Sequence, residues 1–162
     1  MAINYPEVGY VQGQSYIASI LSKYVTPQDI FLIMVSLFEN YGMKEQFLPG
    51  FPGLKKDFYI LIRLQKKYLP KLYERFVEME YIPHIYATEW FLTLFAKFPK
   101  DVVLRIWDIY FVEGRSTLFR FALAIMNLNE IELLKPDTGN FHCILLDRKQ
   151  IKKDELLSTA LK

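Results

Sequence analysis

Cysteine, long apolar runs and excess charge are all scarce in this chain. Its single cysteine, Cys143, excludes an internal disulfide framework and is typical of a reducing compartment. No apolar run approaches the roughly 20 residues that a membrane-spanning helix needs. The N-terminus also lacks the basic-then-apolar order of a signal peptide. We therefore expect a cytoplasmic protein without a membrane span.

Residue patterns that hold metals, bind nucleic acid or mark a serine nucleophile are missing as well. The formal net charge is only +2, which is too small to indicate nucleic-acid binding. Two histidines, His84 and His142, and Cys143 give no metal-binding set at a plausible spacing. The chain has no Gly-x-Ser-x-Gly elbow. We expect no metal site and no nucleic-acid partner.

Apolar and aromatic residues, in contrast, are abundant. Hydrophobic residues make up 52% of the 162 residues and charged residues 23%, a balance typical of one folded domain with a sizeable core. Phenylalanine occurs 13 times and tyrosine 11 times. Because aromatic side chains bury large areas, we expect a bulky core.

The apolar residues recur with the period of helices, and strict alternation is rare. Thr26-Pro27-Gln28-Asp29 is a helix-start signal, and residues 47–53 are predicted as a loop. We predict an all-α bundle of about seven helices with no sheet. The expected helices cover residues 14–24, 27–41, 54–69, 70–80, 84–97, 99–113 and 116–129, the last capped by Ser116 or Thr117.

The most informative stretch is Val8-Gly9-Tyr10-Val11-Gln12-Gly13-Gln14-Ser15, just before the first expected helix. Three further segments follow it: Tyr-Leu-Pro-Lys-Leu-Tyr at 68–73, a tryptophan-bearing helix at 83–95, and Arg-Ile-Trp-Asp-Ile at 105–109. In this order and spacing, the segments resemble the C-terminal portion of a TBC domain. The resemblance covers roughly residues 3–136. TBC domains are GTPase-activating domains for Rab GTPases.

The resemblance implies a catalytic role for Gln12, because the glutamine of the family's Tyr-x-Gln-Gly motif enters the active site of the GTPase. It also implies that Tyr10, Gly9 and Gly13 shape the loop or contact the GTPase. The implied partner is a Rab-type small GTPase in its GTP-bound state. GTP and Mg²⁺ would belong to that partner, so we expect the chain to have no cofactor of its own.

Glutamine is chemically suited to this role. GTP hydrolysis needs an attacking water held in line and a stabilised phosphate charge. A glutamine amide can accept a hydrogen bond from water and donate one to a phosphate oxygen. Gly13 permits close backbone approach, and an extended loop would place Tyr10 on the same side as Gln12. The competing interpretation is that Gln12 is an ordinary surface residue in front of a helix.

The chain departs from the family pattern near this loop. The family's arginine finger stands in an Ile-x-x-Asp-x-x-Arg motif upstream of the glutamine, and only eleven residues precede Gln12. We therefore expect the arginine-finger segment to be absent from the chain and its activity to be weak. Arg63 and Arg115 lack the motif's context, so neither is assigned that role. Gln14 stands where the family usually has methionine, at a position expected to pack beneath the loop.

The end of the chain does not resemble the usual ending of the family. We therefore expect the C-terminal portion of a TBC domain over residues 1–136 and a divergent helical tail over residues 137–162. The apolar residues expected to dock this tail on the domain are Phe141, Ile144, Leu145, Ile151 and Leu156.

Several other residues are expected to be structural. Trp90 and Trp107 are predicted to lie in the core. Arg105 and Asp108 stand three apart on an otherwise apolar helix, so we expect them in the structural core, paired with each other or with a buried neighbour such as Glu89. A set of lysines is expected to form a solvated face: Lys55, Lys56, Lys66 and Lys67.

Two functions follow from these observations. The first is a GTPase activator, which acts on the hydrolytic site of a partner rather than on a substrate of its own. The alternative is a non-catalytic GTPase- or scaffold-binding module. Only the catalytic role requires the amide of Gln12.

A Rab partner would imply vesicle trafficking, peripheral membrane association and recruitment to endomembranes. A third possibility is that the core is incomplete, in which case exposed apolar faces would favour self-association.

Overall fold

A computed structural model describes residues 2–136, 141–146 and 152–161. These residues form helices joined by turns and bends, with no strand among them, so the predicted all-α class is confirmed. The helices are α1 (Gln14–Leu21), α2 (Pro27–Glu39), α3 (Lys44–Phe47), α4 (Pro52–Tyr68), α5 (Pro70–Glu78), α6 (Pro83–Tyr86), α7 (Thr88–Thr93), α8 (Lys100–Glu113), α9 (Ser116–Leu128), α10 (Glu130–Leu133), α11 (Phe141–Leu146) and α12 (Lys153–Ala160).

The predicted number of about seven helices is too low even for this part of the chain. Short helices of four to six residues, namely α3, α6, α7, α10 and α11, stand between the longer ones. Helices this short show almost no periodicity of their own, so the sequence pattern does not separate them from loops or from neighbouring helices.

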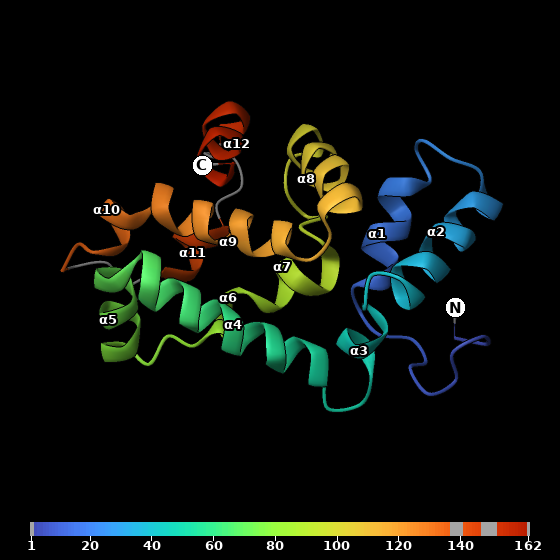
Figure 1. The fold of residues 1–162 in the computed structure, drawn as a ribbon, viewed down its shortest axis with the longest axis horizontal. Coiled ribbons are helices and arrows are strands. Elements are labelled where there is room, and N and C mark those ends of the chain that lie inside the picture. Colours follow the sequence, from blue (N-terminus) through green and yellow to red (C-terminus); the bar gives the residue numbers. More distant parts are fainter. Residues whose placement is uncertain (1, 137–140, 147–151, 162) are drawn as a thin grey trace.

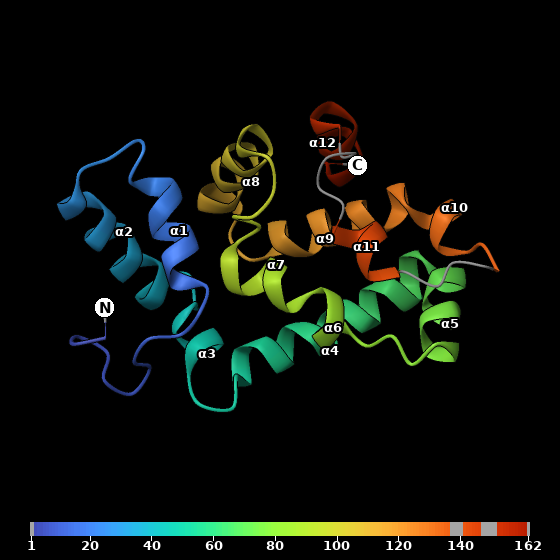
Figure 2. The same cartoon turned by 180° about the vertical axis from the view of Figure 1, so that it is seen from behind.

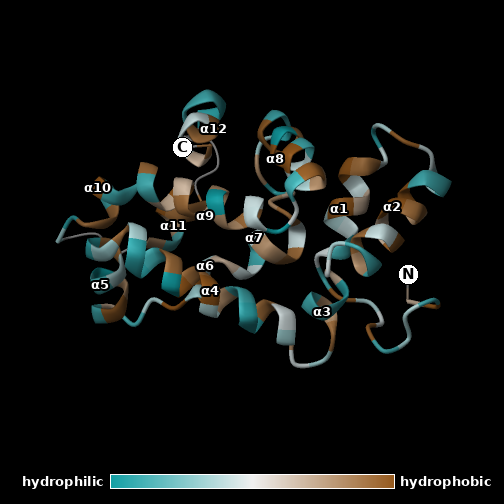
Figure 3. Ribbon diagram, viewed as in Figure 1, coloured by the Kyte–Doolittle hydropathy of each residue, from teal (hydrophilic) through white to brown (hydrophobic). Residues whose placement is uncertain are grey.

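The helices form an elongated assembly (Figure 1). α1 and α2 lie at one end, α5 and α10 lie at the other, and α4 and α9 run along the length between them (Figure 1, Figure 2). Apolar and polar residues are interspersed along α4 (Figure 3), and its buried residues Leu54, Phe58 and Leu61 recur at helical spacing, as expected of a helix with one buried side. The buried apolar side chains form one cluster to which all the helices of the described chain contribute.

The start of α2 follows the sequence signal. The Thr26 hydroxyl accepts a hydrogen bond from the Asp29 backbone N–H at 3.3 Å, and the Asp29 carboxylate accepts one from the Thr26 backbone N–H at 3.4 Å. Pro27 occupies the first turn. This capping box confirms the predicted start of the helix.

The predicted loop over residues 47–53 is wrong at both ends. α3 includes Phe47, and α4 already begins at Pro52. Gly53, which suggested a loop, lies inside α4, where an added Cβ would stand 2.5 Å from the Gln46 side chain and 2.8 Å from the Glu45 backbone. The glycine is therefore explained by the close approach of α3 to α4.

The single helix predicted over residues 84–97 is two short helices, α6 and α7, followed by a sharp turn. Leu94 and Phe95 have left-handed backbones, with φ of 50° and 60°. This conformation costs about 1–2 kcal/mol per residue. Both side chains are fully buried, and the Trp107 indole N–H donates a hydrogen bond of 2.8 Å to the Leu94 carbonyl. These tertiary contacts offset a cost that the local sequence does not reveal.

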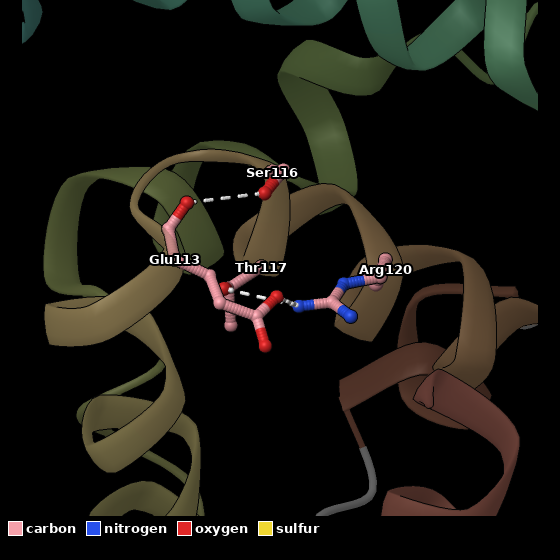
Figure 4. A network of polar contacts seen from close by, with 4 residues as sticks. All are labelled: Glu113, Ser116, Thr117 and Arg120. Carbon is pink, nitrogen blue, oxygen red and sulfur yellow. Dashed lines mark hydrogen bonds and ion pairs between the residues drawn. The ribbon is translucent and has the colours of Figure 1, made fainter. Parts of the chain in front are cut away.

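The turn from α8 to α9 corrects another prediction. Neither Ser116 nor Thr117 caps α9, because Ser116 is already the first helical residue. Ser116 instead donates to the Glu113 carbonyl at 3.3 Å, the contact drawn between these two residues in Figure 4. The Arg120 guanidinium pairs with the Glu113 carboxylate and donates to the Thr117 hydroxyl at 3.4 Å. The side chains thus connect the end of α8 to the first turns of α9.

The tail helices α11 and α12 pack into the same core as the rest of the chain. Phe141, Leu145 and Leu156 are buried, and α12 packs against α9. Ile144 is half-buried, whereas Ile151 lies outside the described residues. The described part of the tail is therefore docked through the apolar positions expected to dock it.

The core residues proposed from the sequence divide into two groups. Trp90 and Trp107 are buried, as predicted. Arg105 and Asp108 are not in the core: their side chains are 55% and 63% exposed, and they pair with each other at 3.0 Å. The prediction was wrong because α8 faces the core with Val102, Val103, Ile106, Trp107 and Tyr110 and places Arg105 and Asp108 on the other side. Glu89 does not pair with them; it pairs with Lys97.

Candidate functional site

The candidate site is built around the Gln12 loop, defined as residues 9–13. The segment before this loop is anchored on α2 and α3. Tyr5 and Val8 are buried, and the Tyr5 ring packs against Phe38 with centroids 5.0 Å apart. The backbone N–H groups of Val8 and Gly9 both donate to the Tyr5 carbonyl, at 3.0 and 2.9 Å. The first residue of the loop is therefore held in place by the core.

A surface ion pair adds to this anchor. The Lys44 ammonium lies 2.6 Å from the Glu7 carboxylate and 5.2 Å from the centroid of the Tyr5 ring. The hydrogen bond with Lys44 lowers the pKa of Glu7, and the same hydrogen bond raises the pKa of Lys44. Both groups therefore favour their charged forms, which keeps the pair between the N-terminal segment and α3.

The other end of the loop is held against α7 by Gly13. Its φ of 129° lies in a region that L side chains rarely adopt, and it occupies the N-cap position of α1. An added Cβ would stand only 3.2 Å from the Leu92 carbonyl oxygen. Any other residue here would strain the backbone and push the loop away from α7. Gly9, at the start of the loop, also has a positive φ but has open space around it.

Between these fixed ends the loop presents its side chains in alternation. Tyr10 and Gln12 are exposed, and Val11 between them packs against the core. The Tyr10 hydroxyl lies 3.4 Å from the Ser15 hydroxyl, so Tyr10 leans over the first turn of α1. Gln12 is thus an exposed amide on a backbone anchored on both sides.

Gln12 borders a hollow of about 290 Å³, called the Gln12 hollow from here on. One wall comes from the Gln12 loop and α1, a second from α6 and α7, and a third from α11. The residues lining it are Gln12, Gly13, Tyr16, Ile85, Tyr86, Thr88, Glu89, Leu92, Thr93, Lys97, His142 and Leu146. Sequence reasoning missed this neighbourhood, because the loop precedes α6 by about 70 residues and α11 by about 130.

The charged side of the Gln12 hollow is a compact polar cluster. The Lys97 ammonium lies 2.6 Å from the Glu89 carboxylate and 4.7 Å from the centroid of the Tyr16 ring. The hydrogen bond with Glu89 raises the pKa of Lys97 above its ordinary value. Thr93 donates its hydroxyl to the Glu89 carbonyl at 2.7 Å. Lys97, which lines the hollow together with Gln12, therefore already has two partners.

Gln14, the residue after Gly13, is buried, with 6% of its surface exposed. Its amide nitrogen has no hydrogen-bond partner among the described residues. A buried donor without a partner costs about 1–3 kcal/mol. The burial agrees with the expectation that this position packs beneath the loop.

Sequence reasoning also missed an ion pair between Asp57 on α4 and Arg115 in the α8–α9 turn. Arg115 donates from Nε to Asp57 Oδ1 at 3.1 Å, and its Nη2 pairs with Oδ2. Burial raises the pKa of Asp57, and the Arg115 guanidinium acts in the opposite direction. The sequence did contain one indication that Asp57 is buried, because it stands on the same face of its helix as Leu54 and Leu61. The Arg115 guanidinium is therefore engaged by Asp57 in this structure.

Two other kinds of site, a membrane-spanning helix and a metal-binding cluster, are not found among the described residues. None of the described helices combines the length and apolar character needed to cross a bilayer. The described histidine, cysteine, aspartate and glutamate side chains contain no group of three or more that could hold a metal ion.

Comparison with known proteins gives the family context. The model of the Rab-GTPase-TBC domain matches residues 1–134. The chain is 46% identical over 132 residues to the GTPase-activating protein GYP5 of Saccharomyces cerevisiae, covering 80% of this chain and 15% of that relative. It is 36% identical over 147 residues to the Rab GTPase-activating protein tbc-11 of Caenorhabditis elegans, covering 88% of this chain and 16% of that relative. The chain thus spans only about a sixth of these relatives.

Two solved structures of Rab-GAP domains have a similar fold. The TBC domain of a flagellar RabGAP from Chlamydomonas superposes with a TM-score of 0.83 at 26% identity, over 99% of this chain and 55% of that chain. The Ypt/Rab-GAP domain of Gyp1p superposes with a TM-score of 0.81 at 22% identity, over 99% of this chain and 61% of that chain, and this likeness concerns the fold alone. On the family match and the identity to its relatives, the chain belongs to the Rab-GTPase-TBC domain family.

Proposed function

We propose that this chain forms the glutamine-bearing part of a GTPase-activating domain that acts on a GTP-bound Rab-type small GTPase. The observation that carries the proposal is the position of Gln12. It is an exposed amide on a loop fixed at one end by the buried Tyr5 and Val8 and at the other by the contact of Gly13 with α7. Such a loop can deliver a side chain into a partner's active site without first having to become ordered.

The proposed task of Gln12 is to orient the attacking water. Its carbonyl oxygen would accept a hydrogen bond from the water, and its amide would donate one to a phosphate oxygen. GTP and Mg²⁺ would be brought by the GTPase, so the chain would act as an activator without turning over a substrate of its own. Tyr10, which is 71% exposed beside Gln12, would contact the GTPase next to the inserted glutamine.

The absence of a matching arginine sets the expected strength of this activity. The 162-residue sequence contains no Ile-x-x-Asp-x-x-Arg motif, so no arginine stands in that context. An arginine finger contributes about 10³–10⁵ to the rate. We therefore expect the chain alone to accelerate hydrolysis weakly, unless an arginine from the GTPase or from a second chain completes the site.

The direct test is hydrolysis by a panel of GTP-loaded Rab proteins with this chain added. Gln12→Ala should abolish any acceleration without altering the fold, because Gln12 is exposed. Gln28→Ala is the matched control, since Gln28 is another exposed glutamine beside a helix start, that of α2. Equal acceleration by the wild type and Gln12→Ala would rule out the glutamine finger.

A non-catalytic outcome is separable in the same experiment. If the folded chain binds a GTP-loaded Rab protein but neither it nor its Gln12→Ala variant changes the hydrolysis rate, the chain is a GTPase-binding module. Binding should then depend on Tyr10 rather than on the Gln12 amide, and a pull-down with Tyr10→Ala and Gln12→Ala measures this difference.

We further propose that the protein is cytoplasmic and reaches endomembranes peripherally, through its GTP-bound Rab partner. The exposed α4 lysines Lys55, Lys56, Lys66 and Lys67 could add attraction to anionic lipid. Sedimentation with phosphatidylserine vesicles, with and without a tethered GTP-loaded Rab protein, tests this recruitment. Binding only in the presence of the Rab protein would support recruitment by the partner.

A further inference from the structure

The segment from Leu94 to Lys97 connects the strained end of α7 to the Gln12 hollow. Leu94 and Phe95 keep their left-handed backbones because both are buried and because Trp107 donates to the Leu94 carbonyl. Two residues later, Lys97 is half-buried at the edge of the Gln12 hollow. The strained turn thus places one lysine next to the Gln12 loop.

Lys97 joins two elements that do not follow each other in the chain. Its ammonium lies 2.6 Å from Glu89 on α7 and 4.7 Å from the centroid of the Tyr16 ring on α1. Tyr16 stands in the first turn of α1, four residues after Gln12, and its backbone N–H donates to the Gly13 carbonyl at 3.1 Å. Any displacement of Tyr16 is therefore transmitted to the end of the Gln12 loop.

A backbone contact supports the same arrangement. Gly13 approaches the Leu92 carbonyl oxygen closely, and α1 packs against α7. Figure 1 and Figure 2 both show α1 beside α7 and α8. The Gly13 contact sets the distance between the loop and α7. The interaction between Lys97 and Tyr16 restrains the lateral position of the first turn of α1 relative to α7.

We propose that Lys97 is a positioning residue. Through its contacts with Tyr16 and Glu89, it holds the Gln12 loop in a fixed position relative to α7. The catalytic consequence rests on the proposed function of Gln12, but the restraint on the loop does not. Lys97 does not itself need to touch the partner or the nucleotide.

The chain contains a matched control for this proposal. The Lys100 ammonium lies 4.8 Å from the centroid of the Tyr24 ring, which is the same type of lysine–aromatic contact. Tyr24 follows the C-terminal end of α1, away from Gln12, and neither Lys100 nor Tyr24 lines the Gln12 hollow. Removing either ammonium breaks a lysine–aromatic contact, and removing that of Lys97 also breaks its pair with Glu89; only Lys97 is expected to affect the loop.

The first experiment measures hydrogen–deuterium exchange in the peptide covering residues 9–16 for the wild type, Lys97→Met, Lys97→Arg and Lys100→Met. Lys97→Met should raise exchange there by about two- to fivefold, as expected from the loss of a cation–aromatic contact. Lys97→Arg should restore protection, because a guanidinium can also pair with Glu89 and stack on Tyr16. Lys100→Met should leave this peptide unchanged.

Three outcomes would overturn the proposal. Exchange in residues 9–16 could be the same for Lys97→Met and Lys100→Met, Lys97→Arg could fail to restore protection, or exchange could rise equally throughout the chain. The last result would mean that Lys97 only supports global stability. This measurement needs no partner, so it decides on the positioning role even if the chain activates no GTPase.

The second experiment measures hydrolysis with a Rab protein that the wild type activates. Lys97→Met should lower kcat by roughly tenfold with KM little changed, because a misplaced glutamine impairs chemistry more than binding. Lys97→Arg should recover most of that loss, and Lys100→Met should behave like the wild type. An unchanged kcat for Lys97→Met, beside a Gln12→Ala variant that is inactive, would reject the positioning role and leave the proposed function intact.

Discussion

The pair of Asp57 with Arg115 and the pair of Glu89 with Lys97 each join a carboxylate to a cation, yet their surroundings differ. The Asp57 side chain is 2% exposed and ties α4 to the turn between α8 and α9. The side chains of Glu89 and Lys97 are 25% and 27% exposed and border the Gln12 hollow. A carboxylate that has lost its water depends on its partner, whereas a pair that keeps part of its water contributes less to stability. The first pair therefore serves the fold, and the second can serve the position of a loop.

The largest expected effect comes from breaking the buried pair. Arg115→Met should lower the free energy of unfolding by about 3–5 kcal/mol, because it leaves the Asp57 charge buried without its partner. Urea unfolding measures the loss, and Arg63→Met, at an exposed arginine on α4, is the control. A loss no larger than that of the control would show that the pair does not stabilise the fold.

The same variant should change how stability depends on pH. Burial raises the pKa of Asp57 above its ordinary value of 3.8, and Arg115 opposes that rise, so the pKa of Asp57 should rise further in Arg115→Met. A carboxyl with a raised folded-state pKa binds more protons in the folded than in the unfolded state, so stability falls as pH rises through that window. The gap between wild type and variant should therefore widen from acidic to neutral pH, as urea unfolding across pH would show.

A smaller effect of opposite sign is expected beside the Gln12 loop. Gln14→Met should raise the free energy of unfolding by about 1 kcal/mol, because it removes a buried amide nitrogen that has no partner among the described residues. Thermal and urea unfolding measure the gain, and Gln28→Met, at an exposed position, should change stability little. A destabilised Gln14→Met variant would indicate that the amide has a partner, such as an ordered water.

The smallest effect is expected at a third ion pair, which extends the comparison to side chains that are more than half exposed. Arg105 and Asp108 are both more than half exposed. Arg105→Ala should change the free energy of unfolding by less than about 0.5 kcal/mol. A double-mutant cycle with Asp108→Ala gives the coupling energy of the pair. A coupling as large as that of the buried pair would contradict the view that burial decides the role of each pair.

Much of the fold follows from local signals that the structure confirms. The capping box before α2, the restart at Pro70 and the end of α8 at Gly114 are set by residues within a few positions of each boundary. Four separated segments, residues 8–15, 68–73, 83–95 and 105–109, carry the resemblance to the family whose model matches the chain. The role of Gln12 stays a prediction, since its exposure is compatible with catalysis and with binding.

Two of the wrong predictions, the single helix over residues 84–97 and the core position of Arg105 and Asp108, share one physical cause, which is that distant contacts override local preference. The left-handed turn at Leu94 and Phe95 exists because their burial and the Trp107 hydrogen bond outweigh its strain. Arg105 and Asp108 were misplaced because the orientation of α8 depends on its packing partners.

The sequence by itself determined the helical class, the starts of α1, α2 and α5, and the exposed Tyr-x-Gln-Gly loop, because short-range sterics, capping and periodicity act between near neighbours. Only the tertiary structure decided which charges are buried and which residues surround Gln12. Asp57 meets Arg115 across 58 positions, and Gln12 shares its hollow with residues as distant as Leu146. Such neighbours depend on how the helices pack, and no local pattern in the chain specifies that arrangement.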